Sequence, residues 1–280
     1  MDLAYIRFPQ FRRKALTLSY DDGVRQDKRL IAILRQHGLK ATFNINSGLF
    51  GATYDGVEKG RMTVQEVLDL YRPAGMEVAI HGCRHLSLTR VAPALALDEI
   101  VSDRKALEAL FGEVITGMAY ANGAFDDATV SLLQSCGVDY ARTTQATERF
   151  DIPEDWLRLP ATCHHNHPRQ MELAHQFVEE ADDSYFWRNG LRLFYLWGHS
   201  YEFDDHDNWN VIEDFSAYMG GHDTIWYATN GEIFRYLQAC KRLQFSMDGS
   251  FVANPSALDV YLDFLGKQVL VPAGQTVSLR

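Results

Sequence analysis

Short apolar runs alternate with segments of helical period from residue 15 to about residue 245, and this alternation limits the folds open to the chain. The runs that we expect to form strands are residues 15–20, 40–46, 76–82, 114–120, 140–144, 192–199 and 225–230, with 156–164 as a further candidate that its proline weakens. The helical segments between them are residues 24–38, 63–75, 96–112, 126–137, 168–181 and 231–243. Because parallel strands need crossover helices, a series of about seven such units predicts an α/β fold with a parallel sheet. At this count we expect the sheet to close into a barrel.

The pattern changes after residue 245. Residues 257–279 alternate apolar and polar side chains around glycine turns, which predicts a small β-hairpin appendage. This segment is too short to hold a core alone. We therefore expect a barrel over residues 1–245 and a C-terminal β extension over residues 246–280 that packs on it.

The overall composition excludes several classes of protein. The chain has 280 residues, 46% of them apolar and 23% charged, which is ordinary for a globular protein. A net charge of -10, without a basic patch, argues against a nucleic-acid partner. No apolar segment is long enough to cross a bilayer and no signal peptide is visible, so we expect a cytoplasmic protein without a membrane partner. The four cysteines are scattered and predict free thiols, and a homo-oligomer remains possible.

Polar side chains follow the expected strands, where a (β/α) barrel places its chemistry. Asp21 and Asp22 are adjacent, and adjacent residues of a strand normally point to opposite faces. If the strand ends at Tyr20 and Gly23 permits a sharp bend, both carboxylates can face the barrel mouth. The plainer alternative is that one of them caps the next helix.

His81 and His85 follow another expected strand and are four residues apart. One helical turn would bring both imidazoles to the same side. Two imidazoles and one carboxylate make a three-ligand site with open positions, as in catalytic zinc and non-haem iron centres. His199 ends a very apolar strand and falls at the same mouth.

The segments "SYDDG", "HGCRH", "AYANG" and "LWGH", in this order, resemble the motif series of the polysaccharide deacetylase family, the carbohydrate esterases with a NodB homology domain. The resemblance covers about residues 14–245 and implies a distorted (β/α) barrel. It implies that Asp21 is the general base and that Asp22, His81 and His85 hold one divalent metal ion. Zinc is the default ion, and cobalt, nickel or manganese suit the same ligands. His199 would be the acid that protonates the leaving group.

Further residues are candidates to bind the substrate. The resemblance implies that the loop from Tyr120 to Gly123 would supply a backbone N–H for the oxyanion, namely that of Asn122. Trp197 and Tyr201 flank His199 and could stack on a sugar ring, although a tryptophan in an apolar strand is more often part of the core.

The sequence departs from the family pattern at three positions. Gly82 stands where the family usually has Ser or Thr, and Ala119 and Ala121 stand where it usually has Arg and Pro. Arg142, at the end of the next strand, is the candidate to orient Asp21 in place of the missing arginine. These departures leave the substrate class open.

The function implied is a metal-dependent deacetylase that removes acetyl groups from a saccharide, and we expect N-acetyl rather than O-acetyl groups. The alternative on the same barrel is a hydrolase of a small-molecule C–N bond of the cyclic amide type. An iron(II) oxygenase fits the ligands but not the βα alternation, and a sugar-binding protein without activity does not explain a full set of base, ligands and acid. His164, His165 and His167 predict a solvated loop, with a second metal site as the alternative.

Overall fold

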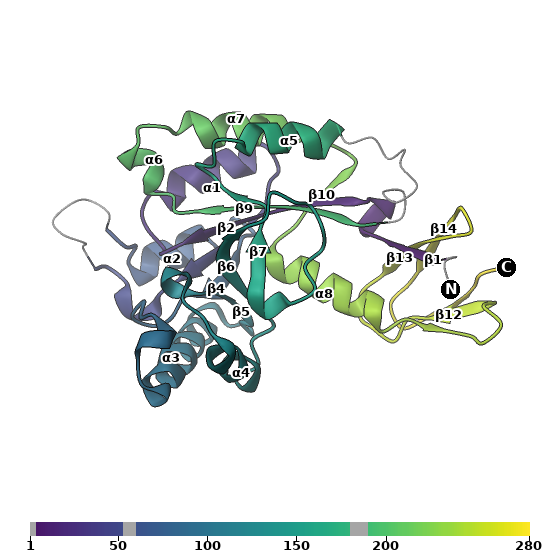
Figure 1. Cartoon of the computed structure of the whole chain (residues 1–280), viewed down its shortest axis with the longest axis horizontal. Coiled ribbons are helices and arrows are strands. Elements are labelled where there is room, and N and C mark those ends of the chain that lie inside the picture. The colour runs from purple at the N-terminus through teal and green to yellow at the C-terminus, as the bar shows by residue number, and fades with distance from the viewer. Residues whose placement is uncertain (1–3, 53–59, 180–189) are drawn as a thin grey trace.

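The structure is a computed structural model, and it describes residues 4–52, 60–179 and 190–280. A nine-stranded parallel sheet forms its centre, in the order β7-β6-β5-β4-β3-β2-β9-β8 with β10 also paired to β2 (Figure 1). The strands are β2 Lys14–Asp21, β3 Ala41–Ile45, β4 Glu77–Ile80, β5 Gly117–Ala119, β6 Tyr140–Ala146, β7 Leu159–Ala161, β8 Cys163–His164, β9 Arg192–Gly198 and β10 Ile225–Tyr227. The helices are α1 Asp27–Gln36, α2 Val64–Leu70, α3 Pro93–Phe111, α4 Asp127–Ser135, α5 Gln170–Glu179, α6 Glu202–Asp205, α7 Asn210–Met219 and α8 Asn230–Lys241. The predicted α/β fold is confirmed, although the last two residues of the helix expected at 168–181 lie outside the described residues.

One short segment closes the sheet into a distorted barrel. β7 pairs with β6 and β8 pairs with β9, and these two strands are separated in the chain by Thr162 alone. The N–H of Thr147 donates to the carbonyl of Ala161 at 3.0 Å, and the N–H of Thr162 donates to the carbonyl of Tyr195 at 2.8 Å. The expected strand at 156–164 is therefore present only from residue 159 on, as two short strands that link the two ends of the sheet, and residues 156–158 form a 3-10 helix.

β2 lies between β3 and β9 in the sheet, and it ends at a different residue from the one expected. All eight of its residues are buried, as is typical of a parallel strand covered on both faces. The strand ends at Asp21, one residue later than expected, and Asp22 (φ 84°) and Gly23 (φ 64°) then turn in the left-handed region. The turn breaks the alternation of side chains, so the carboxylates of Asp21 and Asp22 both reach the barrel mouth.

The helices cover the outside of the barrel. In Figure 1, α1, α5 and α7 lie together above the sheet and α3 and α4 lie below it. α1 buries Leu30, Ile31 and Leu34 on one stripe, as an amphipathic helix does. Among the described residues, no helix combines the length and the apolar character needed to cross a membrane.

The C-terminal part forms two three-stranded antiparallel sheets instead of a single hairpin. One sheet has the order β1-β13-β14 and the other β11-β12-β15. Their strands are β1 Ala4–Arg7, β11 Gln244–Phe245, β12 Phe251–Ala253, β13 Val260–Phe264, β14 Lys267–Val271 and β15 Thr276–Ser278. The expected hairpin is the pair β13–β14, and the sequence analysis missed that β1 from the other end of the chain pairs with β13.

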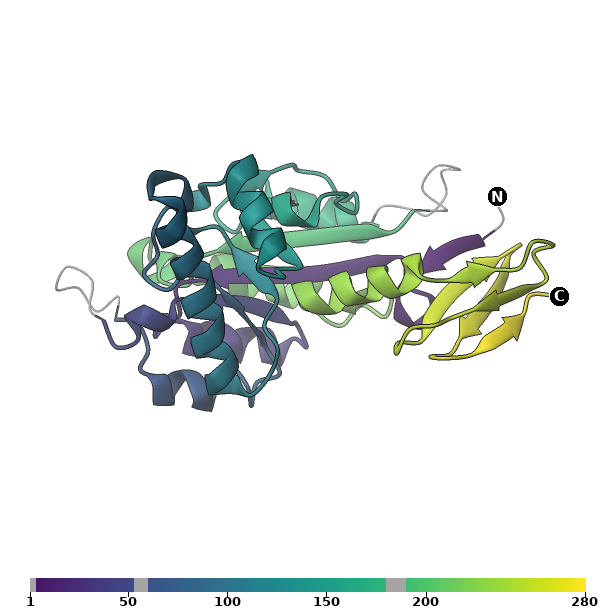
Figure 2. The same cartoon turned by 90° about the horizontal axis from the view of Figure 1, so that it is seen from below.

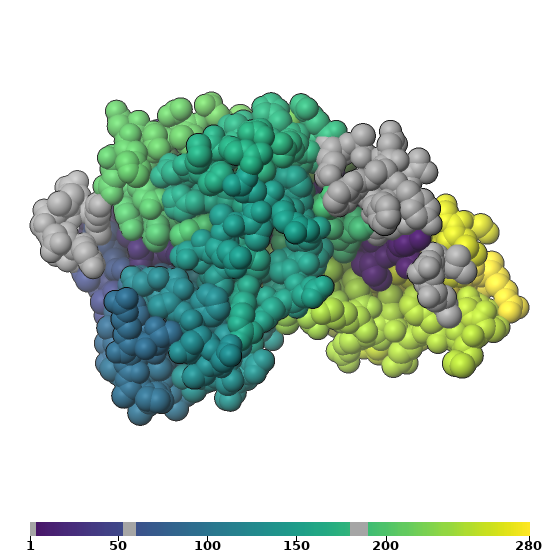
Figure 3. Space-filling view, in the orientation of Figure 1, coloured from purple at the N-terminus to yellow at the C-terminus, as the bar shows by residue number. Residues whose placement is uncertain are grey.

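These sheets form a lobe at one end of the molecule, away from the loops at the barrel mouth (Figures 2 and 3). Val260 and Leu262 of the lobe belong to the same apolar cluster as Tyr236 of α8 and Phe8. Tyr236 also accepts the N–H of Tyr261 at 3.1 Å. The lobe is thus joined to the barrel through α8.

Candidate active site

A cavity of about 470 Å³ opens at the carboxyl ends of the parallel strands, where barrel enzymes bind substrates. Its lining contains all the predicted catalytic, metal-binding and substrate-binding residues except Arg142. The lining residues are Asp21, Asp22, Val24, Arg61, His81, His85, Tyr120, Asn122, Gly123, Thr144, Trp197, His199 and Tyr201. The strand ends therefore bring together the residues that the motifs had placed apart in the sequence.

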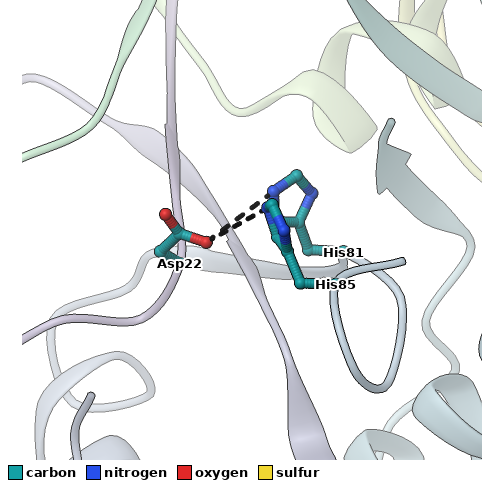
Figure 4. Close-up of side chains that lie close together, drawn as sticks. All are labelled: Asp22, His81 and His85. Carbon is teal, nitrogen blue, oxygen red and sulfur yellow. Dashed lines mark ion pairs between the residues drawn. The ribbon is translucent and has the colours of Figure 1, made fainter. Parts of the chain in front are cut away.

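Asp22, His81 and His85 converge on one point of this cavity (Figure 4). Asp22 Oδ1 lies 3.9 Å from His81 Nε2 and 3.5 Å from His85 Nε2. His81 Nδ1 lies 2.8 Å from the carbonyl of Ala119, which fixes the proton on Nδ1 and leaves the Nε2 lone pair facing the carboxylates. His81 Nε2 is buried and has no hydrogen-bond partner in the described part of the chain. A buried, unpartnered imidazole nitrogen aimed at a carboxylate and a second imidazole fits a divalent metal ion of the zinc type.

The ionisation states of His85 and Asp22 are those required of metal ligands. Burial, followed by the charge of His81, lowers the pKa of His85 to about 4, so its imidazole is neutral near pH 7. Burial alone would raise the pKa of Asp22, but the charges of His81 and Arg61 outweigh burial and lower it. A neutral imidazole at His85 and an ionised carboxylate at Asp22 are the forms in which these side chains bind metals.

The sequence analysis missed Arg61, which lies against Asp22. Its guanidinium donates to Asp22 Oδ1 at 3.0 Å and also to the side-chain oxygen of Asn46. A carboxylate oxygen accepts more than one interaction, so this bond leaves Asp22 able to serve as a ligand. Arg61 follows a segment without periodicity, and no signal in the sequence marks it.

Asp21 lies beside the three candidate ligands but is held by other partners. It forms a buried ion pair with Arg142, and Asn44 Nδ2 donates to its Oδ1 at 2.8 Å. Asp21 Oδ2 lies 3.8 Å from His81 Nε2 and 3.8 Å from His199 Nε2. Burial would raise the pKa of Asp21, but the charges of Arg142, His81 and His199 together lower it well below the usual carboxylate range. Asp21 is therefore an ionised group between the two imidazoles.

His199 is placed by Glu202, three residues later in the chain. His199 Nδ1 lies 3.2 Å from Glu202 Oε1, so Nε2 is the nitrogen that faces Asp21 and the cavity. Burial would lower the pKa of His199, but the hydrogen bond to Glu202 and the charges of Asp21 and Asp22 raise it. The sequence contained a signal for this contact, because Glu202 follows His199 by three residues in "WGHSYEF" and an acidic residue at this distance can bind the imidazole.

The expectation of a solvated loop for the histidines of "CHHNHP" is wrong for His165. His165 is fully buried, and its ring stacks on Phe203 at 4.2 Å between centroids. His165 Nε2 and His164 Nε2 lie 2.8 and 3.1 Å from Glu202 Oε2. The N–H of Asn166 donates to His164 Nδ1 at 3.2 Å, which places the ring proton of His164 on Nε2, facing Glu202. His164, His165 and Glu202 also place their ligand atoms within 4.8 Å of one another, as the alternative of a second metal site requires, whereas the proton on His164 Nε2 favours contact with the carboxylate over metal binding.

The remaining predicted residues surround the cavity. Trp197 and Tyr201 line it on either side of His199, with the ring centroid of Tyr201 5.1 Å from that of His199. Tyr120 lines it with its ring, since its hydroxyl donates to the carbonyl of Leu157 at 2.8 Å. Asn122 lies in a one-turn helix, Ala121–Gly123, with φ 57°. Arg142 does not line the cavity and lies behind Asp21, with its guanidinium 4.3 Å from the Trp197 ring centroid.

Comparison with known proteins agrees with this arrangement. The model of the polysaccharide deacetylase family matches residues 9–141, which confirms the resemblance for the first three motifs, and the fourth, "LWGH", lies outside the matched residues. A search of curated proteins gave no match.

Solved structures with a similar fold include two that align over most of this chain. Puue allantoinase is 15% identical, with a TM-score of 0.59 over 81% of this chain and 91% of the allantoinase. A Mycobacterium smegmatis protein assigned to the polysaccharide deacetylases is 16% identical, with a TM-score of 0.57 over 86% of this chain and 96% of that protein. A Streptococcus pyogenes deacetylase in complex with acetate is 20% identical over 46% of this chain and 55% of its own length, with a TM-score of 0.41. The first two likenesses support the fold, a barrel built from a parallel sheet and covering helices.

Proposed function

We propose, from the membership of residues 9–141 in the polysaccharide deacetylase family, that this chain is a metal-dependent hydrolase that removes acetyl groups from a saccharide. The observation that carries the proposal is the convergence of Asp22, His81 and His85, with the Nε2 of His81 buried and unpartnered. A carboxylate that is not part of this trio, Asp21, lies within 3.8 Å of His81 Nε2. Ligands and base thus occupy one cavity.

Asp22, His81 and His85 would hold the metal ion, with zinc as the first expectation. A bound divalent ion polarises a carbonyl oxygen and lowers the pKa of a coordinated water. Asp21 is the proton acceptor for the water that attacks the acetyl carbon. Its ion pair with Arg142 keeps it ionised and oriented, in the place of the arginine that the third motif lacks. Arg142 is therefore a positioning residue for the base.

His199 is the proton donor to the leaving group. An amine leaves poorly as an anion, so cleavage of an N-acetyl group needs a proton delivered to nitrogen. The raised pKa of His199, due to Glu202 and the two aspartates against the opposing effect of burial, favours the protonated form. This supports N-acetyl over O-acetyl groups as the substrate. The backbone N–H of Asn122 would stabilise the oxyanion, and one such donor typically contributes roughly 3–4 kcal/mol.

The walls of the cavity suit a sugar. The aromatic residues Tyr120, Trp197 and Tyr201 line it, and of these Tyr120 and Trp197 are largely buried. Aromatic faces pack against the C–H-rich faces of pyranose rings, and the polar groups between them can bind hydroxyls. The substrate class we propose is therefore an acetylated saccharide.

A second candidate is a hydrolase of a small-molecule C–N bond of the cyclic amide type. Its support is the fold shared with Puue allantoinase together with the alanines at 119 and 121. The ligands, base and acid would keep the same roles, because ring opening at an amide also needs an activated water and a proton for nitrogen.

The experiment that tests the proposal measures acetate release from a panel of N- and O-acetylated saccharides, with and without a chelator. Cyclic amides are assayed in parallel for ring opening. We expect acetate release that the chelator abolishes and that added zinc restores. Asp21→Asn should bind metal like the wild type and lose turnover, whereas Asp22→Asn should lose the metal. Activity that persists in metal-free protein would refute the proposal, and ring opening without acetate release would select the second candidate.

A further inference from the structure

Two buried carboxylates on one helix hold the loop that carries His81 and His85. Glu99 and Asp103 are one turn apart on α3, and both are fully buried. Such acids are almost never fully buried in proteins unless they are paired. Both accept backbone N–H groups of the loop of residues 81–86, and neither lines the catalytic cavity.

Asp103 secures the beginning of the loop. The N–H of His81 donates to Asp103 Oδ2 at 2.9 Å, and the N–H of Ser47 donates to Asp103 Oδ1 at 2.7 Å. On the other side, Asn46 Nδ2 donates to the carbonyls of His81 and Gly82 at 2.9 and 2.6 Å. His81 therefore leaves its strand with its backbone held from both sides.

Glu99 holds the two residues that flank His85. The N–H of Arg84 donates to Glu99 Oε2 at 2.8 Å, and the N–H of Leu86 reaches the same oxygen at 3.5 Å. The Arg84 side chain donates to Glu99 Oε1 at 2.5 Å. His85 itself has φ 60°, in the left-handed region that a residue with a side chain seldom adopts. The carboxylate thus bridges the backbone on both sides of a strained residue.

Gly82 makes room for this carboxylate. Its φ is +80°, and a Cβ added there would lie 3.3 Å from Glu99 Oε2. The departure from Ser or Thr at position 82 therefore accompanies the approach of Glu99 to the loop. In this chain the interaction that shapes the loop comes from α3 and not from a side chain at position 82.

We infer that Glu99 is the positioning residue of the metal centre, which turns His85 toward Asp22 by binding the N–H groups of Arg84 and Leu86. The inference rests on the proposed function, because it takes Asp22, His81 and His85 to be the metal ligands. The strain at His85 is retained because Glu99 binds both flanks. Outer partners of metal ligands typically change metal affinity by about 10- to 100-fold when they are removed.

The test compares Glu99→Gln with Asp98→Asn in a titration of the metal-free protein with Co²⁺, read from the visible absorption of the bound ion. Asp98 is the matched control, because it pairs with the same Arg84 at 2.6 Å but is exposed and makes that contact at the solvent side. We expect Glu99→Gln to weaken Co²⁺ binding by at least about tenfold and to change the absorption bands, since the geometry at His85 changes. Asp98→Asn should bind like the wild type. Thermal unfolding of the metal-free variants checks that each is folded.

Glu99→Asp is the second variant, for use if Glu99→Gln does not fold. It retains the charge but is one methylene shorter, so it should also weaken Co²⁺ binding. Equal affinity and equal spectra for the wild type and a folded Glu99 variant would overturn the inference and leave the proposed function standing. A wild-type protein that binds no Co²⁺ would overturn both.

Discussion

Arg142, in β6, forms a buried ion pair with Asp21, the last residue of β2. Three strands separate β6 from β2 in the sheet, so the pair crosses the interior of the barrel. Both side chains are at most 3% exposed, and the indole ring of Trp197 covers the guanidinium. The pair links the opposite walls of the barrel directly beneath the candidate active site.

Replacing Arg142 should destabilise the fold through Asp21. Arg142→Met leaves a buried carboxylate without its counter-ion, and loss of one partner of a buried pair typically costs about 3–5 kcal/mol. Adding Asp21→Asn to this variant should recover much of that loss, because the unpaired charge is gone. Urea unfolding of the two single variants and the double variant measures the coupling. Arg149→Met is the control, since Arg149 is 74% exposed and its ion pair should contribute little. A change below about 1 kcal/mol for Arg142→Met would contradict the expectation.

The parallel strands could be predicted because a strand covered on both faces reads as a continuous apolar run, as β2 and β9 do. The position of the motifs at strand ends was then enough to predict that Asp21, Asp22 and the histidines lie in one site, because a barrel brings the carboxyl ends of all its strands to the same mouth. The pairing of β1 with β13 could not be predicted. It joins Ala4 to Phe264, and the alternation of a short strand does not identify its partner.

The partners of the site residues were harder to predict than the site residues themselves. Arg61 lies on a loop and meets Asp22 only through the tertiary fold. Glu99 and Asp103 had a usable signal, because they fall on the same helix face as Ile100 and Leu107, where an apolar residue is expected. Acidic residues on the buried stripe of a helix indicate a partner in the core, but the sequence does not say which one.

Glu202→Gln should move the pH dependence of activity. In the profile of activity against pH, the fall at high pH, the basic limb, reports deprotonation of His199. The pKa of His199 is raised by Glu202 and by the charges of Asp21 and Asp22, although burial opposes them. Without the carboxylate of Glu202, the pKa of His199 falls and the basic limb shifts to lower pH. The acidic limb belongs to Asp21, whose lowered pKa places it below the usual carboxylate range, and it should not move. Profiles of kcat/KM against pH measure both limbs, with Glu213→Gln on the exposed face of α7 as the control. An unchanged basic limb would remove Glu202 from the control of His199.

Asp27 should make the protein less stable as the pH rises. It is fully buried and accepts hydrogen bonds from Ser200 Oγ at 2.6 Å and from the hydroxyl of Tyr71. Burial raises the pKa of Asp27 from 3.8 to about 7, although the two hydrogen bonds oppose the shift. A carboxyl whose pKa is higher in the folded state stabilises the fold fully below its unfolded pKa, and this contribution is lost as the pH rises through about 7.

The loss for Asp27 is on the order of 4 kcal/mol, from about 1.4 kcal/mol per pKa unit. Asp27→Asn keeps a polar group between the two hydroxyls and removes the titration. Its free energy of unfolding should therefore fall less than that of the wild type between about pH 4 and pH 8. Urea unfolding at several pH values in this range measures the difference, and identical slopes for the two proteins would show that Asp27 titrates normally.

Gly198→Ala should destabilise the protein by forcing His165 out of its place. A Cβ at position 198 would lie 2.1 Å from His165 Nδ1, and the His165 ring cannot retreat because it is packed between Tyr20 and Phe203. Overpacking of this kind typically costs about 1–3 kcal/mol, which corresponds to a fall of roughly 2–10 °C in Tm. Thermal unfolding measures the change, with Gly190→Ala as the control, because a Cβ at Gly190 meets no atom of the described residues within 4 Å. Because His165 also contacts Glu202, the variant should lose activity together with stability. A Tm equal to that of the wild type would show that the ring of His165 is not held at this position.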